Sequence, residues 1–274
     1  MTPAQLRKLA ADPRFISGIY NYCDRWCERC PLSHRCLSYA MEKAEDDGDP
    51  GARDLANKKF WNKLHASFQL TLQMLQEDAQ RHGIDLNAPE ARAEAEAHER
   101  QVRRRAARNR PVSRAAREYG LAVQAWFENC PAMFRAKGVD LVKQARLEIG
   151  RPLEEAEEIR EMLDIIQWYH LFIHVKLERA IDSQAEEELE TDPELRSVMN
   201  DANGSAKIAL IGIDRSLTAW AALRSHFPEQ EDAILDFQIR LARLRRDAEK
   251  LFPQARAFVR PGFDEEATRL ELGG

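Results

Sequence analysis

The amino-acid sequence predicts an all-α protein, in which a helical bundle follows a cysteine-rich N-terminal loop. No segment shows the alternating pattern of a β-strand, and apolar residues instead recur at intervals of three and four. Proline and glycine separate these periodic stretches at distances that suit helices. We therefore expect helices joined by short turns and packed around a shared hydrophobic core.

Residues with known preferences for helix ends bound the expected helices. Gly83 suits the C-terminal end of a first long helix, and Asn87 with Pro89 suits the start of the next. Gly150 suits a later helix end, and Asp192 suits the N-cap of a short helix. A turn is expected at Gly48-Asp49-Pro50-Gly51, and helices are expected over residues 54–82, 89–110, 112–129, 132–149, 152–185, a short stretch after Asp192, 203–226 and 229–251.

Composition limits the classes of protein to consider. The chain has 274 residues, of which 44% are hydrophobic, so it can bury a sizeable core. A net charge of −5 gives no overall electrostatic attraction for nucleic acid or for an anionic membrane. No apolar run reaches the roughly 18–20 residues that span a bilayer, and the N-terminus lacks the apolar stretch of a secretory signal. We therefore expect a cytoplasmic protein.

Four of the five cysteines lie within 14 residues of one another. Cys23, Cys27, Cys30 and Cys36 have the spacing C-x3-C-x2-C-x5-C. Thiols in a reducing compartment stay free, and clustered ones tend to bind metal. The sequence thus predicts an N-terminal cysteine-rich metal-binding loop. It divides the chain into a metal-binding segment at 1–50, a helical bundle at 51–252 and a C-terminal tail at 253–274.

Two metal centres suit these four thiolates. A zinc ion holds its sulfur ligands close together, and proteins commonly supply them from two separated C-x2-C arms. A [4Fe–4S] cluster is larger, and one contiguous loop can wrap around its well-separated corners. Arg25, Arg29 and Arg35 alternate with the cysteines and could offset the negative charge of such a cluster. We expect the iron–sulfur cluster, and zinc, with His34 as a substitute ligand, remains the alternative.

The segment from Cys27 to Cys36 resembles a known cluster loop. Its pattern, C-x2-C-P-x4-C with Pro31 after Cys30, is similar to the end of the [4Fe–4S] loop in endonuclease III-type DNA glycosylases and in cluster-bearing nucleases of the RecB and Cas4 type. The resemblance implies ligation by Cys27, Cys30 and Cys36, with Cys23 as the fourth ligand. It covers about ten residues. In this chain three residues, not six, separate the first two cysteines, and neither a helix–hairpin–helix nor a nuclease core is recognisable, so the resemblance implies no DNA-directed activity.

Polar residues also form lines on helices that are otherwise apolar. His170 and His174 are one helical turn apart, and Glu178 continues the same face. Two imidazoles at this spacing can hold one metal ion. With Asp214 or His65 from another helix they could form a second metal or acid–base site. The alternative is that each line is the solvated face of its helix.

Six arginines lie close together in the expected helix 89–110. They are Arg100, Arg103, Arg104, Arg105, Arg108 and Arg110. This block could contact a phosphate backbone. The same helix begins with glutamates, however, and the helix dipole favours acidic residues at the start and basic residues at the end of a solvated helix.

Nucleotide-binding glycine patterns and nucleophile elbows are missing, so the sequence predicts no particular reaction. The expected function is iron–sulfur cluster binding for a structural, redox or sensing purpose, with a possible redox partner. The alternatives are a metal-dependent enzyme and a zinc-stabilised module that binds nucleic acid or protein.

Overall fold

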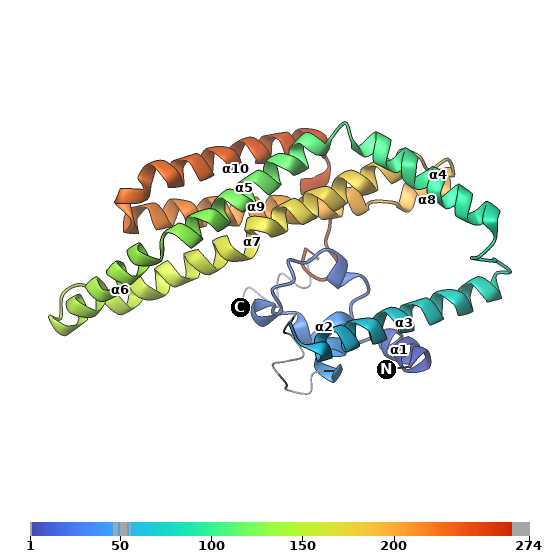
Figure 1. Ribbon diagram of the computed structural model, residues 1–274, viewed down its shortest axis with the longest axis horizontal. Helices are drawn as coiled ribbons and strands as arrows, with labels where there is room; N and C mark the ends of the chain where they lie inside the picture. The colour runs from blue at the N-terminus through green and yellow to red at the C-terminus, as the bar shows by residue number, and fades with distance from the viewer. Residues whose placement is uncertain (1, 46–48, 50–53, 55, 265–274) are drawn as a thin grey trace. The chain divides into compact units, whose positions relative to one another are not determined.

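The computed structural model describes residues 2–45, 49, 54 and 56–264 (Figure 1). Within these residues all regular structure is helical and no β-strand occurs, which confirms the predicted all-α class. None of the described helices combines the length and the apolar character that crossing a lipid bilayer requires. The turn expected at Gly48-Asp49-Pro50-Gly51 lies, except for Asp49, outside the described residues.

The chain divides into two compact units. One comprises Met1–Gln101 together with Arg260–Gly274, and the other comprises Val102–Val259. The boundaries expected from the sequence, after residues 50 and 252, are therefore not those of the compact units. The long helix that follows the cysteine loop belongs with the loop, and so does the segment that follows Val259.

The first unit contains the cysteine loop, three helices that precede residue 82, and most of α4 (Pro89–Ala106). The first helix, α1 (Pro3–Ala10), starts at Thr2 with a capping box, in which the Thr2 side chain and the Gln5 side chain each bond the other's backbone N–H. Helix α1 packs against α3 (Lys58–Arg81), and Arg7 forms an ion pair with Glu77 at 2.6 Å. Four elements follow α1 and precede α3 along the chain. They are the short turns η1 (Ile19–Asn21), η2 (Cys27–Arg29) and η3 (Ser33–Arg35), and the helix α2 (Leu37–Glu45).

The second unit is a helical bundle built on its longest helix. Helix α7 (Pro152–Glu187) contacts α5 (Arg110–Asn129) on one side and α9 (Asp201–His226) on another, and α10 (Glu231–Leu251) packs against both α5 and α9 (Figure 1). Shorter elements complete the unit. These are the end of α4 (Pro89–Ala106), α6 (Pro131–Arg146), which packs on α7, α8 (Pro193–Val198), η5 (Pro228–Gln230) and η6 (Ala255–Ala257).

Aromatic side chains fill the centre of this bundle. Trp220 and Tyr119 are fully buried, and the Trp220 Nε1–H donates to Tyr119 Oη at 3.0 Å. Phe237 stacks on Trp220 with ring centroids 4.7 Å apart, and the edge of Trp126 meets the same pair. Each buried ring removes a large apolar area from water, so this cluster is a main source of the bundle's stability.

Two glycines allow the bundle helices to approach closely. A Cβ atom on Gly120 of α5 would lie 2.5 Å from the backbone oxygen of His170 in α7. A Cβ atom on Gly212 of α9 would lie 2.9 Å from the Tyr169 ring. Both distances are shorter than real Cβ contacts, so α5 and α9 can pack this closely against α7 because these positions lack a side chain.

Several helix ends differ from the expected ones. Helix α3 begins at Lys58 rather than at residue 54, and α4 ends at Ala106 rather than at residue 110. Helix α6 ends at Arg146 instead of Ile149, because Glu148 takes the left-handed conformation (φ 54°) and the Ile149 N–H bonds back to the Gln144 carbonyl. Helix α9 begins at Asp201 rather than at residue 203, so Gly204 lies inside the helix.

Candidate metal centre

Tight turns of the backbone position the four cysteines of the N-terminal loop. Cys23 follows η1, and its Sγ lies 3.7 Å from the Tyr20 carbonyl. Cys27 begins η2, and the Cys30 N–H closes this turn on the Cys27 carbonyl at 3.3 Å. Cys36 ends η3 in the same way, with its N–H 3.2 Å from the Ser33 carbonyl. Repeated three-residue turns therefore set the spacing of the thiols.

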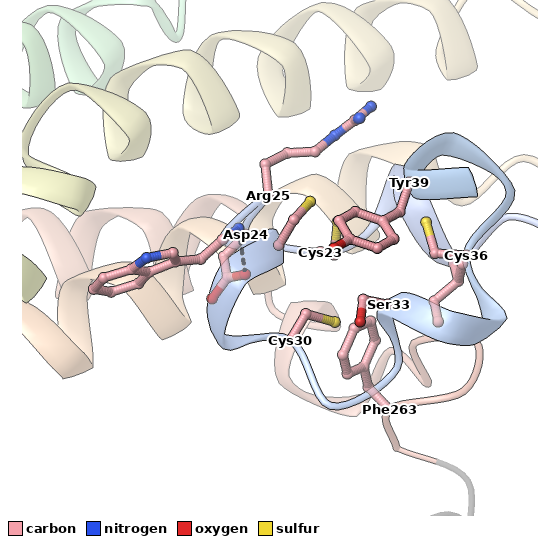
Figure 2. A pocket seen from close by; sticks show the side chains of 11 residues that line it. Cys23, Asp24, Arg25, Cys30, Ser33, Cys36, Tyr39 and Phe263 are labelled. Atoms are coloured by element: carbon pink, nitrogen blue, oxygen red, sulfur yellow. Dashed lines mark hydrogen bonds between the residues drawn. The ribbon is translucent and has the colours of Figure 1, made fainter. Parts of the chain in front are cut away.

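All four cysteines line one pocket, which has a cavity volume of about 20 Å³. Figure 2 shows Cys23, Cys30 and Cys36 around this pocket, with the rings of Tyr39 and Phe263 beside them. The structure thus brings together the four residues that the sequence singled out, although they come from separate turns. The remaining lining residues are Ile19, Asp24, Arg25, Trp26 and Ser33.

Phe263 reaches this pocket from the other end of the chain. It belongs to a short C-terminal turn in which the Arg260 side chain and backbone N–H bond the Asp264 carboxylate at 2.9–3.0 Å. Gly262 has φ 76°, and a Cβ atom there would lie 2.7 Å from Ile16 Cδ1. Glycine therefore lets the turn settle against the loop. This segment was expected to be a C-terminal tail, so Phe263 was not among the predicted site residues. The local sign of a turn here is Gly262, which stands next to Phe263.

Burial and mutual repulsion raise the pKa values of Cys27 and Cys30. The pKa of Cys27 is raised to about 11, first by burial and then by the nearby Cys23, Glu42, Cys36 and Cys30. Burial also raises the pKa of Cys30, while the Leu32 N–H, which donates to the sulfur, acts in the opposite direction. A metal centre would have to displace these protons and would supply the positive charge that four thiolates need.

The loop arginines lie at the edge of the pocket. Arg25 adopts φ 59°, which is uncommon for a residue other than glycine, and its guanidinium donates to Ser38 Oγ at 3.0 Å. The Arg29 guanidinium lies 4.0 Å from the centre of the Trp26 ring. Both side chains are exposed, and of the two only Arg25 lines the pocket.

In the residues that the structure describes, no three His, Cys, Asp or Glu side chains are grouped so that they could hold one metal ion. This statement applies to the four cysteines as they stand and to the second site suggested by the sequence. His34, the substitute ligand of the zinc alternative, belongs to η3 and is not among the residues that line the pocket. The four thiols therefore share a pocket without sharing the position of a single ion.

The polar line on α7 faces α5 and is occupied by local bonds. His170 Nδ1 lies 2.6 Å from the Gln167 carbonyl, and burial lowers the pKa of this histidine. His174 Nδ1 lies 3.0 Å from the Ser113 carbonyl. Glu178 accepts hydrogen bonds from Arg110 and from the Ser113 hydroxyl. His174 and Glu178 therefore bond to α5, and His170 bonds within α7.

The other two residues of the suggested second site lie elsewhere. Asp214 of α9 is paired with Arg256 from η6 and with Arg245 from α10. His65 is exposed on α3, which belongs to the first unit. The structure therefore does not bring His170, His174, Glu178 and Asp214 together.

The arginine block of residues 100–110 is largely engaged in ion pairs. Arg105 and Arg108 both contact Glu188 at 3.4 Å, and Arg110 contacts Glu178 and Asp182. Glu178 and Asp182 belong to α7, and Glu188 directly follows it. The ion pairs therefore link the C-terminal end of α4 and the start of α5 to α7. They also offset the positive charge that a phosphate backbone would meet. Arg100 pairs with Glu96 within α4.

Comparisons with protein-family models, with curated proteins and with solved structures give no match. The geometry of the cysteine pocket is therefore the main indication of what the protein does.

Proposed function

We propose that the protein binds a [4Fe–4S] cluster through Cys23, Cys27, Cys30 and Cys36. The observation that carries this proposal is the shared pocket: four thiols from one short loop line a single cavity. Thiolate sulfur is the ligand that iron–sulfur clusters require, and four cysteines complete the ligand set of a cubane.

The arrangement of the thiols favours a cluster over zinc. A single zinc ion, with Zn–S bonds of about 2.3 Å, requires its four ligands within one coordination sphere. The described side chains include no such group, and the four cysteines instead come from separate turns around one narrow pocket. A cubane carries its ligands on separate corners, so it suits thiols from separate turns, and it requires the loop to open around it.

The walls of the pocket suit a centre that is protected from water. Ile19 is buried, and the aromatic side chains of Trp26, Tyr39 and Phe263 line the same space. An apolar shell of this kind controls solvent access and the local dielectric, and with them the reduction potential of a cluster. The backbone N–H of Leu32, which bonds to Cys30, is a second such influence.

Single cysteine variants test this proposal. The wild-type chain, purified without oxygen, is expected to show the broad visible absorbance of an iron–sulfur protein. Cys27→Ser and Cys30→Ser should each lose most of this absorbance, because each removes one of four ligands. Cys130→Ser is the matched control, since Cys130 lies beside Gln230 in the second unit and should leave the spectrum unchanged.

Two results would contradict the proposal. Colourless wild-type protein that contains one zinc ion would favour the zinc-stabilised module instead. An equal loss of absorbance in Cys130→Ser and Cys27→Ser would show that the centre is not specific to the loop.

A further inference from the structure

The space between the loop thiols is too small to admit anything much larger than a water molecule. Its cavity volume is about 20 Å³, and a water molecule needs roughly 10–15 Å³ of such space. The core of a [4Fe–4S] cluster has eight heavy atoms, so part of the pocket wall has to move before a cluster can enter. The parts of this wall differ in how they are held.

Backbone hydrogen bonds hold the loop side of the pocket. Cys30 and Cys36 each donate their N–H to the carbonyl three residues earlier, at 3.3 Å and 3.2 Å. The Ile16 N–H donates to the Arg35 carbonyl at 3.0 Å and closes the loop on itself. An opening on this side would break bonds of this kind, and each lost bond between buried groups costs free energy.

The C-terminal turn, residues 260–264, forms another side of the pocket and contains its own hydrogen bonds. The backbone N–H groups of Phe263 and Asp264 both donate to the Arg260 carbonyl at 3.2 Å. The Arg260 guanidinium donates to the Asp264 carboxylate, and its central carbon lies 4.9 Å from the centre of the Phe263 ring. Arg260 therefore stabilises both the turn and the position of the ring that lines the pocket (Figure 2).

Apolar groups of the C-terminal turn pack on the loop. A Cβ atom on Gly262 would lie 2.7 Å from Ile16 Cδ1 and 3.2 Å from Ile19 Cδ1, and the Phe263 ring lines the same pocket as the buried Ile19. Apolar contacts are not directional. The turn can therefore separate from these side chains and return to them while its internal hydrogen bonds stay intact.

We infer that residues 260–264 form a lid over the cysteine pocket. The lid opens when the turn carries Phe263 away from the loop, and it closes again over whatever has entered. The entry of a cluster rests on the proposed function, whereas the access of other reagents to the thiols does not. Opening of the lid limits the rate at which the four thiols are reached and leaves them unchanged as ligands.

The reactivity of the thiols in the metal-free, full-length chain tests the lid. Cys130→Ser serves as the background, so that the four loop cysteines are the only ones left to react. A bulky aromatic disulfide, dithiobis-nitrobenzoate, releases one coloured thiolate for each thiol that it modifies. Asp264→Asn breaks the ion pair with Arg260, whose two side chains are only 12% and 19% exposed. The closed lid loses this pair, so the reaction should accelerate about fivefold.

Arg260→Gln separates the opening of the lid from a change in charge. It removes a positive charge where Asp264→Asn removes a negative one, so an electrostatic effect on the thiol pKa values would move the two rates in opposite directions. Opening of the lid raises both rates. Asp12→Asn is the control, because it breaks an ion pair with Arg14 in the same unit, does not line the pocket and should react as the background does. Circular dichroism confirms that every variant keeps its helices.

Two outcomes of the thiol measurement would overturn the inference. Both lid variants would react at the background rate, or their rates would move in opposite directions. A wild-type chain that binds no iron would contradict the proposed function instead, and the thiol rates would still decide whether the lid exists.

The rates of cluster uptake and loss distinguish a lid from a residue that merely stabilises the site. Uptake from ferrous iron and sulfide should be faster in Asp264→Asn than in the wild type, and so should loss to an iron chelator. The final iron content should be unchanged, because the four ligands remain. Slower uptake together with a lowered iron content would contradict the lid.

Discussion

Phe263 connects the end of the chain to the cysteine pocket. Its ring lines the pocket because Gly262 and the Arg260–Asp264 ion pair hold the segment in a tight turn. The ring carries no metal ligand, so in the proposed cluster-binding protein it would limit the access of water and oxygen to the thiols. An aromatic wall of this kind affects how long a bound centre survives more than whether it forms.

Phe263→Ala should therefore shorten the lifetime of the cluster in air several-fold. Its iron content after anaerobic purification should match that of the wild type, since all four ligands remain. The measurement is the decay of visible absorbance after exposure to oxygen. Phe15→Ala removes an aromatic ring from the same unit that does not line the pocket, and it should decay as the wild type does. Equal lifetimes for all three proteins would exclude a shielding role.

His170 makes the stability of the bundle depend on pH. Burial lowers its pKa in the folded chain below the ordinary value of 6.5. As the pH falls below about 6.5, the unfolded chain takes up this proton first, so the free energy of unfolding decreases with falling pH. Above that value the contribution is fully present.

His170→Gln should weaken this pH dependence. Urea unfolding at about pH 7.5 and about pH 5.5 gives the loss of stability across the titration range. The loss should be smaller in His170→Gln than in the wild type. His98→Gln, at an exposed position on α4, should retain the wild-type loss. A His170→Gln variant with an unchanged loss would contradict the assignment.

At the scale of single elements, the end of α6 contains a strained residue. Glu148 occupies the left-handed conformation that usually ends a helix at glycine, and its side chain pays a steric cost there. Glu148→Gly should therefore raise the free energy of unfolding of the bundle. Relief of the strain contributes about 0.5–1 kcal/mol, and the greater conformational entropy of glycine in the unfolded chain reduces this gain. Thermal unfolding measures the change. Gly138→Ala, in the middle of the same helix with open space around it, should also stabilise, by its helix propensity alone. A destabilised Glu148→Gly variant would show that its carboxylate has an essential partner.

The sequence predicted helix ends well where the signal is local. Gly83 has φ 67° at the end of α3, Pro89 begins α4, and Asp192 accepts a hydrogen bond from the Glu194 N–H at 2.8 Å. The start of α9 was placed two residues late, because Gly204 resembled a helix boundary. In the structure Gly204 is buried inside the helix, where a small residue suits close packing.

The candidate site was predictable in part for the same reason. Four cysteines in one contiguous loop are visible in the sequence, and the structure places them around one pocket. Phe263 is far from them in the chain, and its contact follows from tertiary packing that no local pattern records. The polar line at His170 and His174 had two interpretations, and the sequence did not indicate that Ser113 of α5 contacts His174.

At the scale of the whole molecule, the division into two units separates the cysteine pocket from the bundle. The core of Val102–Val259 contains its own buried aromatic cluster, and all four loop cysteines lie in the other unit. A fragment of residues 102–259 should therefore fold alone, with a helical circular dichroism spectrum and a cooperative thermal transition. It should bind no iron. A fragment that unfolds without cooperativity would show that the bundle needs the first unit.

Elemental analysis of the anaerobically purified full-length chain tests the central claim most directly. Iron, acid-labile sulfide and zinc are measured on one sample together with the protein concentration. The account predicts about four iron atoms and about four sulfides per chain, with no stoichiometric zinc. One zinc per chain without iron or sulfide, or a chain that retains no metal at all, would contradict it.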